Sequence, residues 1–250
     1  GLDRVRITYH DTDVIPEGLG AFSSRATVFG GNAVAGAIRE LHRVATAAAA
    51  EHLGVAEKSI AIEGERARVK RGKRSIELGE LGVEATYRYE PEEGSHVLVG
   101  ANLAMVRVDR GTGGVEILRY GISYDVGRAV NPLTLEGQIR GGAVQGIGGA
   151  LLEEFAYSED GQPLSTSFMD YAMATAAETS PIDVVVLELA EAAEGDPLGG
   201  AKGGGEGGII GVGATIANAV ADAIGAPPGE LTTLPLTPER VKAAAQRAAP

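Results

Sequence analysis

A single carboxylate, that of Glu206, stands in a loop made almost entirely of small residues. The segment 200–208 reads Gly-Ala-Lys-Gly-Gly-Gly-Glu-Gly-Gly. Glycine permits positive φ and lets a ligand approach the backbone closely, at an entropic cost to the folded chain. A loop that accepts this cost around one glutamate indicates an acid or base presented to a bound molecule. Two plainer interpretations stay open: a solvated surface carboxylate, or a glutamate favoured by a helix N-terminus.

A second group of glycines follows Asn131-Pro132, a pair that predicts the start of a helix running to about Phe155. Helical spacing puts six residues on one face, namely Gln138, Gly141, Gly142, Gln145, Gly146 and Gly149. Each interior glycine costs roughly 0.5–1 kcal/mol relative to alanine. This face therefore packs closely against another element or lies against a ligand. The two glutamine amides, each with donor and acceptor atoms, favour the ligand.

Two other segments carry polar groups of less certain purpose. Ser23-Ser24-Arg25 lies in a glycine-containing loop that leads into a helix. It is typical either of an anion site or of a capping serine beside a solvated arginine. Asp125-x-Gly127 and Asn131-Pro132 indicate turn and helix-entry roles. The stretch 203–208 also matches G-x-G-x-x-G, but the break at Asp196-Pro197 and the absence of a predicted second strand disfavour a classical dinucleotide site.

Composition excludes several classes of protein. The 250-residue chain carries 34 acidic and 22 basic residues, a net charge of −12 that argues against nucleic-acid binding. It has no cysteine and four scattered histidines, so disulfides and thiolate metal sites are excluded. No apolar run is expected to reach the roughly 18 residues of a membrane span. No signal-peptide pattern follows Gly1, and a cytoplasmic location is the expectation.

The remaining pattern predicts an α/β fold of α+β-like character, with mixed sheets packed against helices and room for two small subdomains. Residues 11–30 are predicted to form a loop. Helices are predicted at about 33–53 (closed by Gly54), 131–155, 209–224 and from 239 onward. Strands are predicted within 59–90, in a hairpin of 97–108 with 115–124, and as a buried strand at 182–189.

Taken together, these segments resemble the molybdenum-containing large subunit of the xanthine oxidase family, which includes aldehyde oxidoreductases and aerobic carbon monoxide dehydrogenases. The matching stretches keep the family order between about residues 10 and 225, and they are Gly20-Ala21-Phe22-Ser23-Ser24-Arg25, Asp125 to Pro132, Gly137 to Gly148, Glu153-Glu154 and Gly200 to Glu206. The resemblance implies that residues 1–250 are the C-terminal part of a molybdenum-cofactor-binding domain. Gly204 departs from the family, which often has a β-branched residue there.

The resemblance implies a molybdenum–pterin dinucleotide, with the cytosine form expected, and oxidation of an aldehyde, an N-heterocycle or carbon monoxide with oxygen derived from water. In the family, the glutamate of a K-G-x-G-E loop takes a proton from the Mo–OH group, and Glu206 matches it. Gln138 matches a glutamine that hydrogen-bonds the pterin. Further cofactor contacts are expected from Ser23, Ser24, Arg25, Gly141, Gly142, Gln145, Lys202, Gly203 and Gly205. The metal's ligands come from the pterin and from inorganic groups, so no protein ligand to the metal is expected.

The implied partners are the N-terminal part of the large subunit, iron–sulfur and FAD subunits that carry electrons away, and a small-molecule substrate. The isolated chain is expected to be inactive. Two alternatives stay open. One is a non-catalytic half-domain used for assembly or partner contact, and the other is a nucleotide-binding module built on the glycines of 203–208.

Overall fold

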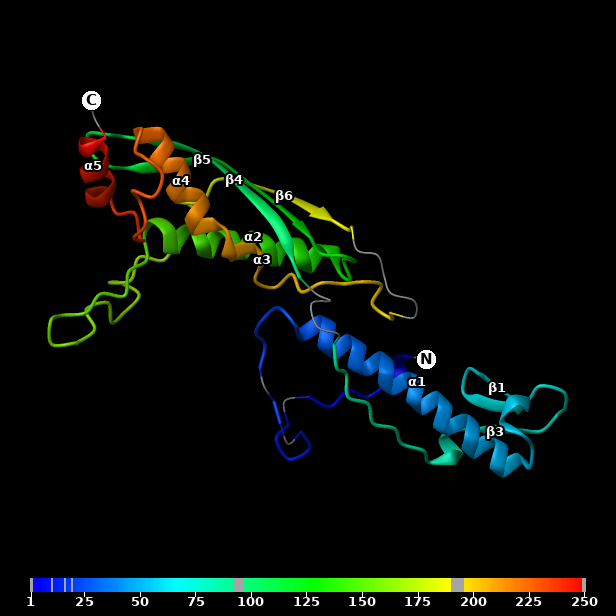
Figure 1. The fold of residues 1–250 in the computed structure, drawn as a ribbon. Helices are drawn as coiled ribbons and strands as arrows, with labels where there is room; N and C mark the ends of the chain where they lie inside the picture. The colour runs from blue at the N-terminus through cyan, green and yellow to red at the C-terminus, as the bar shows by residue number, and fades with distance from the viewer. Residues whose placement is uncertain are drawn as a thin grey trace.

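The structure, a computed structural model, describes residues 2–9, 11–15, 17–18, 20–91, 97–189 and 196–248. Within these ranges the chain forms two units, each built on a three-stranded sheet (Figure 1). The first unit contains helix α1 and strands β1 to β3, and the second contains strands β4 to β6 and helices α2 to α5. The predicted α/β class with two small subdomains is confirmed.

The first unit is one long helix against a small antiparallel sheet. Helix α1 spans Ala26–Leu53 and packs on β1 (Ile60–Glu63), β2 (Arg66–Val69) and β3 (Ser75–Glu77), with short 3₁₀ turns at Leu2–Arg4, Glu57–Ser59 and Leu78–Leu81. Gly54 ends α1 in a left-handed conformation (φ 61°), which confirms the predicted cap.

The predicted loop over 11–30 is wrong at its end, because α1 already begins at Ala26. The early glycines of this helix serve close packing. A Cβ on Gly31 would lie 2.9 Å from Leu198 Cδ1, and a Cβ on Gly36 would lie 2.1 Å from the Tyr87 ring. In the sequence Gly31 reads as the end of a loop, whereas Gly36 lies inside the predicted helix 33–53; in the fold both glycines admit close neighbours.

The second unit contains a mixed sheet in the order β4-β5-β6. Strands β4 (Val99–Val108) and β5 (Val115–Asp125) form the predicted antiparallel hairpin, and β6 (Ile182–Leu187) runs parallel to β5. The hairpin turn is stabilised by Asp109, whose Oδ1 accepts hydrogen bonds from Gly111 N (2.8 Å) and Thr112 N (3.2 Å). Strand β6 is an edge strand with alternating exposure, and Val185 is 53% exposed. The strand predicted at 182–189 is therefore confirmed, but the prediction that it is buried is wrong.

Helices cover one face of this sheet. Helix α2 (Pro132–Leu151) begins at the predicted Asn131, whose Oδ1 accepts from Thr134 N (3.2 Å), and ends four residues before the predicted Phe155. The predicted helix 209–224 is two helices, α3 (Gly207–Ile210) and α4 (Val212–Ile224). Helix α5 (Pro238–Arg247) has Thr237 as its N-cap. The core lies between the sheet, α2 and α4, with α5 closing one end.

Residues 207–224, which form α3 and α4, are long and apolar enough to cross a membrane by length and composition alone. The sequence pattern predicts no such stretch. In the fold, Val212, Ile216, Val220 and Ile224 are all fully buried. Such burial is typical of a core helix, whose apolar side chains are satisfied by protein neighbours.

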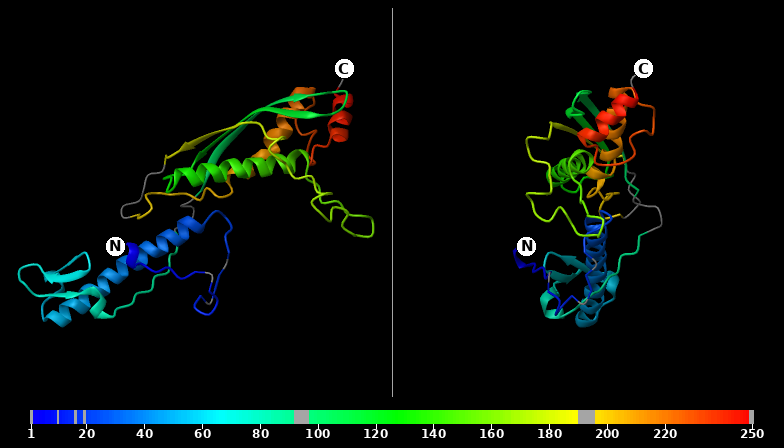
Figure 2. Two further views of the ribbon diagram at one scale, coloured as in Figure 1. Left: turned by 180° about the vertical axis from the view of Figure 1, so that it is seen from behind. Right: turned by 90° about the vertical axis from the view of Figure 1, so that its left-hand side faces the viewer.

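The two units meet at one end of α1 (Figures 1 and 2). The turn before α1 lies beside the loop 196–206, which follows β6 and leads into α3. Away from this contact, the segment between α2 and β6 projects from the second unit as an arm (Figure 2). The candidate site lies where the units meet.

Candidate functional site

The glycine loop is fastened to the end of β5 by its own backbone. Lys202 N donates to Val126 O at 2.8 Å. Upstream, the Asp196 carboxylate accepts from Leu198 N (2.9 Å) and Gly200 N (2.6 Å), which folds the turn that enters the loop. Gly200 has a φ of +77°, a conformation that glycine adopts without strain. The loop therefore has a defined path.

A mostly buried ion pair adds a second anchor. Lys202 Nζ forms an ion pair with Asp125 Oδ2, and the two side chains are 17% and 13% exposed, respectively. Asp125 Oδ1 also accepts from Gly127 N (3.0 Å) and Leu189 N (3.1 Å). The Lys202 ammonium group, followed by these backbone donors, lowers the pKa of Asp125 to about 2. The charge of Lys202 is thus neutralised at the base of the loop.

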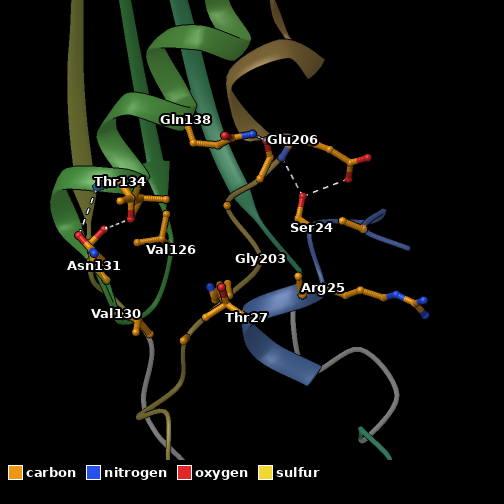
Figure 3. Close-up of a pocket in the computed structure, with 18 of the residues that line it drawn as sticks. Ser24, Arg25, Thr27, Val126, Val130, Asn131, Thr134, Gln138, Gly203 and Glu206 are labelled. Carbon is orange, nitrogen blue, oxygen red and sulfur yellow. Dashed lines mark hydrogen bonds between the residues drawn. The ribbon is translucent and has the colours of Figure 1, made fainter. Parts of the chain in front are cut away.

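Glu206 is held by a serine from the other unit. Ser24 Oγ accepts from Glu206 N (2.8 Å) and donates to Glu206 Oε2 (3.0 Å), as Figure 3 shows. Ser23 and Ser24 have φ values of +53° and +54°, which are uncommon for residues with a Cβ. A Cβ on Gly203 would lie 2.4 Å from Ser24 O. Gly203 is therefore required for the approach of the Ser24 backbone.

Gln138 joins helix α2 to the same loop. Its Nε2 donates to Gly205 O at 2.8 Å, one residue before Glu206 (Figure 3). The two glycine-bearing segments that the sequence singles out therefore converge at Glu206. The second amide hydrogen and the carbonyl of Gln138 have no hydrogen-bond partner among the described residues.

The converging segments enclose a cleft of about 480 Å³. The residues that line it come from three segments, within 21–27, within 126–138 and 201–206. Seven of the predicted site residues line it, namely Ser24, Arg25, Gln138, Lys202, Gly203, Gly205 and Glu206. A second cavity of about 310 Å³ shares Glu206 and adds Ser23, Phe29, Leu98 and Ile210. Glu206 therefore lines both cavities, which also share Ser24, Arg25 and Gly203.

Three predicted residues, Gly141, Gly142 and Gln145, line neither cavity. A Cβ on Gly142 would lie 3.0 Å from Gly208 Cα, while Gly141 and the exposed Gln145 face open space. Gly146 behaves like Gly142, since its Cβ would lie 2.6 Å from Val212 Cβ. Close packing of α2 on α3 and α4 accounts for these two glycines, and only the Gln138 end of the face reaches the cleft.

Arg25 lines the cleft but its charge is directed elsewhere. The guanidinium carbon lies 3.8 Å from the centroid of the Phe22 ring, a cation–π contact. In Figure 3 the side chain points away from Asn131 and Gln138. Arg25 therefore borders the cleft through its backbone and the first atoms of its side chain.

The wall formed by residues 126–131 was not predicted as part of the site. Asp125-x-Gly127 and Asn131-Pro132 have the turn and capping roles that the sequence indicates. Their backbone also faces the glycine loop across the cleft. Their position could have indicated this role, because they follow the carboxyl end of a strand and precede a helix, where α/β proteins commonly bind ligands.

The donor set of the cleft suits a flat cofactor that brings its own metal ligands. Among the described residues no group of His, Asp and Glu could hold a metal ion, and His10 and His96 lie outside those residues. The cleft offers glycine backbone at 203–205, the side-chain amides of Asn131 and Gln138, the hydroxyl groups of Ser24, Thr27 and Thr134, and one carboxylate, that of Glu206. A Cβ on Gly204 would lie 2.6 Å from Leu135 Cδ1. This wall therefore has no side chain at position 204 because Leu135 occupies the space.

Comparison with known proteins assigns the family. A family model described as "Molybdopterin cofactor-binding domain" matches residues 1–180. The chain is 40% identical to the 6-hydroxypseudooxynicotine dehydrogenase complex subunit gamma of Paenarthrobacter nicotinovorans, over 96% of this chain and 32% of that protein. It is 33% identical to the carbon monoxide dehydrogenase large chain of Afipia carboxidovorans, over 88% of this chain and 29% of that protein.

Solved structures agree with this assignment. The fold matches quinoline 2-oxidoreductase from Pseudomonas putida 86 with a TM-score of 0.73 and 30% identity, covering 93% of this chain and 31% of that one. The chain thus spans about a third of the length of the relatives it matches. It belongs to the molybdopterin cofactor-binding family of the xanthine oxidase, aldehyde oxidoreductase and carbon monoxide dehydrogenase large subunits.

Proposed function

We propose that this chain is part of the catalytic subunit of a molybdenum hydroxylase, with Glu206 as the general base. The observation that carries the proposal is the place of Glu206, at the point where the glycine loop, Gln138 and the turn at Ser24 converge on one cleft. The family supplies the reaction class: oxidation of an aldehyde, an N-heterocycle or carbon monoxide with oxygen derived from water. The rest of the large subunit completes the site.

The residues of this chain would form one wall of a cofactor cleft. A molybdenum–pterin dinucleotide, in its cytosine form, supplies the redox chemistry when bound. Gln138 has an amide hydrogen and a carbonyl available for a heterocycle edge. The wall consists of the backbone of Lys202, Gly203 and Gly205, and it continues through Ser23, Ser24 and Arg25. Gly141 and Gln145, which face open space, contribute only where a bound group extends along α2, whereas Gly142 packs on Gly208.

Glu206 has one oxygen engaged and one oxygen available. Oε2 accepts from Ser24, whereas no described residue donates to Oε1. We therefore assign Oε1 as the atom that accepts the proton during substrate oxidation. A positioned general base contributes roughly 10²–10⁴-fold to a rate.

The relatives favour an N-heterocyclic substrate within the three classes. Two of the three relatives described above are named for compounds with a pyridine-type ring, and the third for carbon monoxide.

One of these relatives is a subunit of a complex by name. We accordingly propose iron–sulfur and FAD subunits as electron-accepting partners and a cytoplasmic location. A nucleotide-binding module is less well supported, since β6 ends at Leu187 and the four-residue α3 follows the glycines.

The test uses the complete large subunit, purified with the subunits that accompany it. We expect stoichiometric molybdenum and pterin, and turnover of 6-hydroxypseudooxynicotine or quinoline ahead of benzaldehyde or carbon monoxide, with an artificial electron acceptor. Glu206→Gln should keep the molybdenum and lose at least about 100-fold in kcat, as expected for a general base. Glu116→Gln, which changes an exposed side chain of strand β5, is the matched control and should stay within twofold.

Three outcomes would count against the proposal. An active Glu206→Gln protein removes Glu206 from the chemistry. A complex without molybdenum favours the non-catalytic half-domain. Tight binding of NAD or ATP in place of the pterin favours the nucleotide-binding module.

A further inference from the structure

The carboxylate of Glu206 has one side-chain partner in the described part of the chain, the hydroxyl of Ser24. A serine hydroxyl donates one hydrogen bond and accepts others. Here both directions are used on the same residue, because Ser24 Oγ accepts from Glu206 N and donates to Glu206 Oε2. The pair closes a small ring that fixes the backbone and the carboxylate of Glu206 together.

The local backbone is organised around this contact. Ser24 and its neighbour Ser23 both hold left-handed φ values, which residues with a Cβ adopt only when their surroundings impose them. Glycines of the loop stand on either side of Ser24. A Cβ on Gly203 would lie 2.4 Å from Ser24 O, and a Cβ on Gly205 would lie 3.4 Å from Ser24 Oγ. The turn at Ser23 and Ser24 and the glycine loop 203–205 therefore pack against each other at the Ser24 hydroxyl group.

We propose that Ser24 is a positioning residue that aims the carboxylate of Glu206, an inference that rests on the proposed role of Glu206 as the base. A glutamate side chain has several rotatable bonds, and a fixed carboxylate avoids the loss of rate that misplacement causes. Ser24 engages Oε2, and no described residue donates to Oε1. In Figure 3 the carboxylate lies on the Ser24 side of the loop and points away from Gln138. Ser24 precedes α1 in the first unit, and Glu206 follows β6 in the second. The contact between the two units therefore fixes the orientation of the Glu206 carboxylate.

The experiment uses the complete large subunit with its accompanying subunits, and the variants Ser24→Ala and Ser24→Gly. Both remove the hydroxyl group, while glycine keeps the left-handed backbone without strain. We expect unchanged molybdenum content, KM for 6-hydroxypseudooxynicotine or quinoline within threefold, and kcat lower by 10- to 100-fold. In the Glu206→Gln background, Ser24→Ala should change kcat by less than twofold, since the two residues act as one unit.

A second measurement needs no substrate. Ser24 Oγ accepts from Glu206 N, so hydrogen exchange in peptides covering 203–208 should be at least tenfold faster in both Ser24 variants. Ser158→Ala is the matched control, because that hydroxyl also accepts from a backbone amide (Gln162 N, 3.2 Å) but lies in the arm away from the cleft. It should leave both kcat and exchange in 203–208 unchanged.

The outcomes separate this inference from the proposed function. If Glu206→Gln abolishes turnover while both Ser24 variants keep full kcat, Glu206 remains the base and the positioning role of Ser24 is wrong. If exchange in 203–208 does not change, the contact itself is refuted. If Glu206→Gln remains active, the proposed function fails, whatever the exchange data show about Ser24.

Discussion

The ion pair between Lys202 and Asp125 is expected to hold the loop that carries Glu206, and Lys202→Met tests this expectation. Methionine keeps most of the length of the side chain and removes its charge. In the variant, Asp125 keeps its hydrogen bonds from Gly127 N and Leu189 N but loses its cation. A mostly buried carboxylate without its partner is destabilising.

The size of the effect follows from the pKa of Asp125. That pKa lies at about 2, against an ordinary value of 3.8. At 1.36 kcal/mol per pKa unit, the difference corresponds to about 2 kcal/mol. Lys202 contributes the most among the three groups that lower this pKa, so we assign it between about 1 and 2 kcal/mol, or about 5- to 30-fold in local opening. Because the pKa is lowered, this stabilisation is complete above about pH 4 and is lost as the pH falls through about 2.

The assay is hydrogen exchange in the complete subunit at neutral pH. Peptides covering 125–130 and 198–206 should exchange about 5- to 30-fold faster in Lys202→Met, and peptides from α5 should not change. Arg107→Met breaks an exposed pair with Glu116 and serves as the control, with no effect on the loop peptides. Unchanged protection together with loss of molybdenum would refute the reasoning, because Lys202 would then act on the cofactor directly.

Two further predictions concern glycines. Gly203→Ala places a Cβ 2.4 Å from the backbone oxygen of Ser24, so the loop should shift at a cost of about 1–3 kcal/mol. The molybdenum content of the complex should then fall, and an unchanged molybdenum content would contradict this steric argument. Gly208→Ala places a Cβ 2.3 Å from Ile139 O and should lower the thermal midpoint of the assembled protein. Gly149→Ala, which meets nothing within 4 Å, should instead stabilise α2 by about 0.5–1 kcal/mol, and equal midpoints for the two variants would disprove the packing argument.

Local sequence signals predicted much of the fold. The β4–β5 hairpin, the start of α2 at Asn131-Pro132 and the left-handed Gly54 follow from turn and capping chemistry within a few residues. The start of α1 was missed because Gly30 and Gly31 read as the end of a loop, and the close neighbour of Gly31 is Leu198, which is distant in sequence. Strand β6 was predicted, but its exposure was missed because a short apolar run does not reveal its place at the edge of a sheet.

The site was predicted in part for the same reason. Spacing and residue type pointed to Glu206 and Gln138, and the structure brings them to one loop. The partner of Lys202 lies 77 residues away, and Ser24 lies 182 residues from Glu206. No local pattern encodes such pairs, because only the folded backbone brings them within hydrogen-bond distance.

The most direct measurement is an experimental structure of the complete holoenzyme with its cofactor bound. We predict the pterin in the cleft between Gln138 and the loop 203–205, with the Glu206 carboxylate facing the metal and Ser24 on its Oε2. A cofactor bound elsewhere, or protein side chains filling the space between Glu206 and the metal, would contradict the assignment of Glu206 as the base.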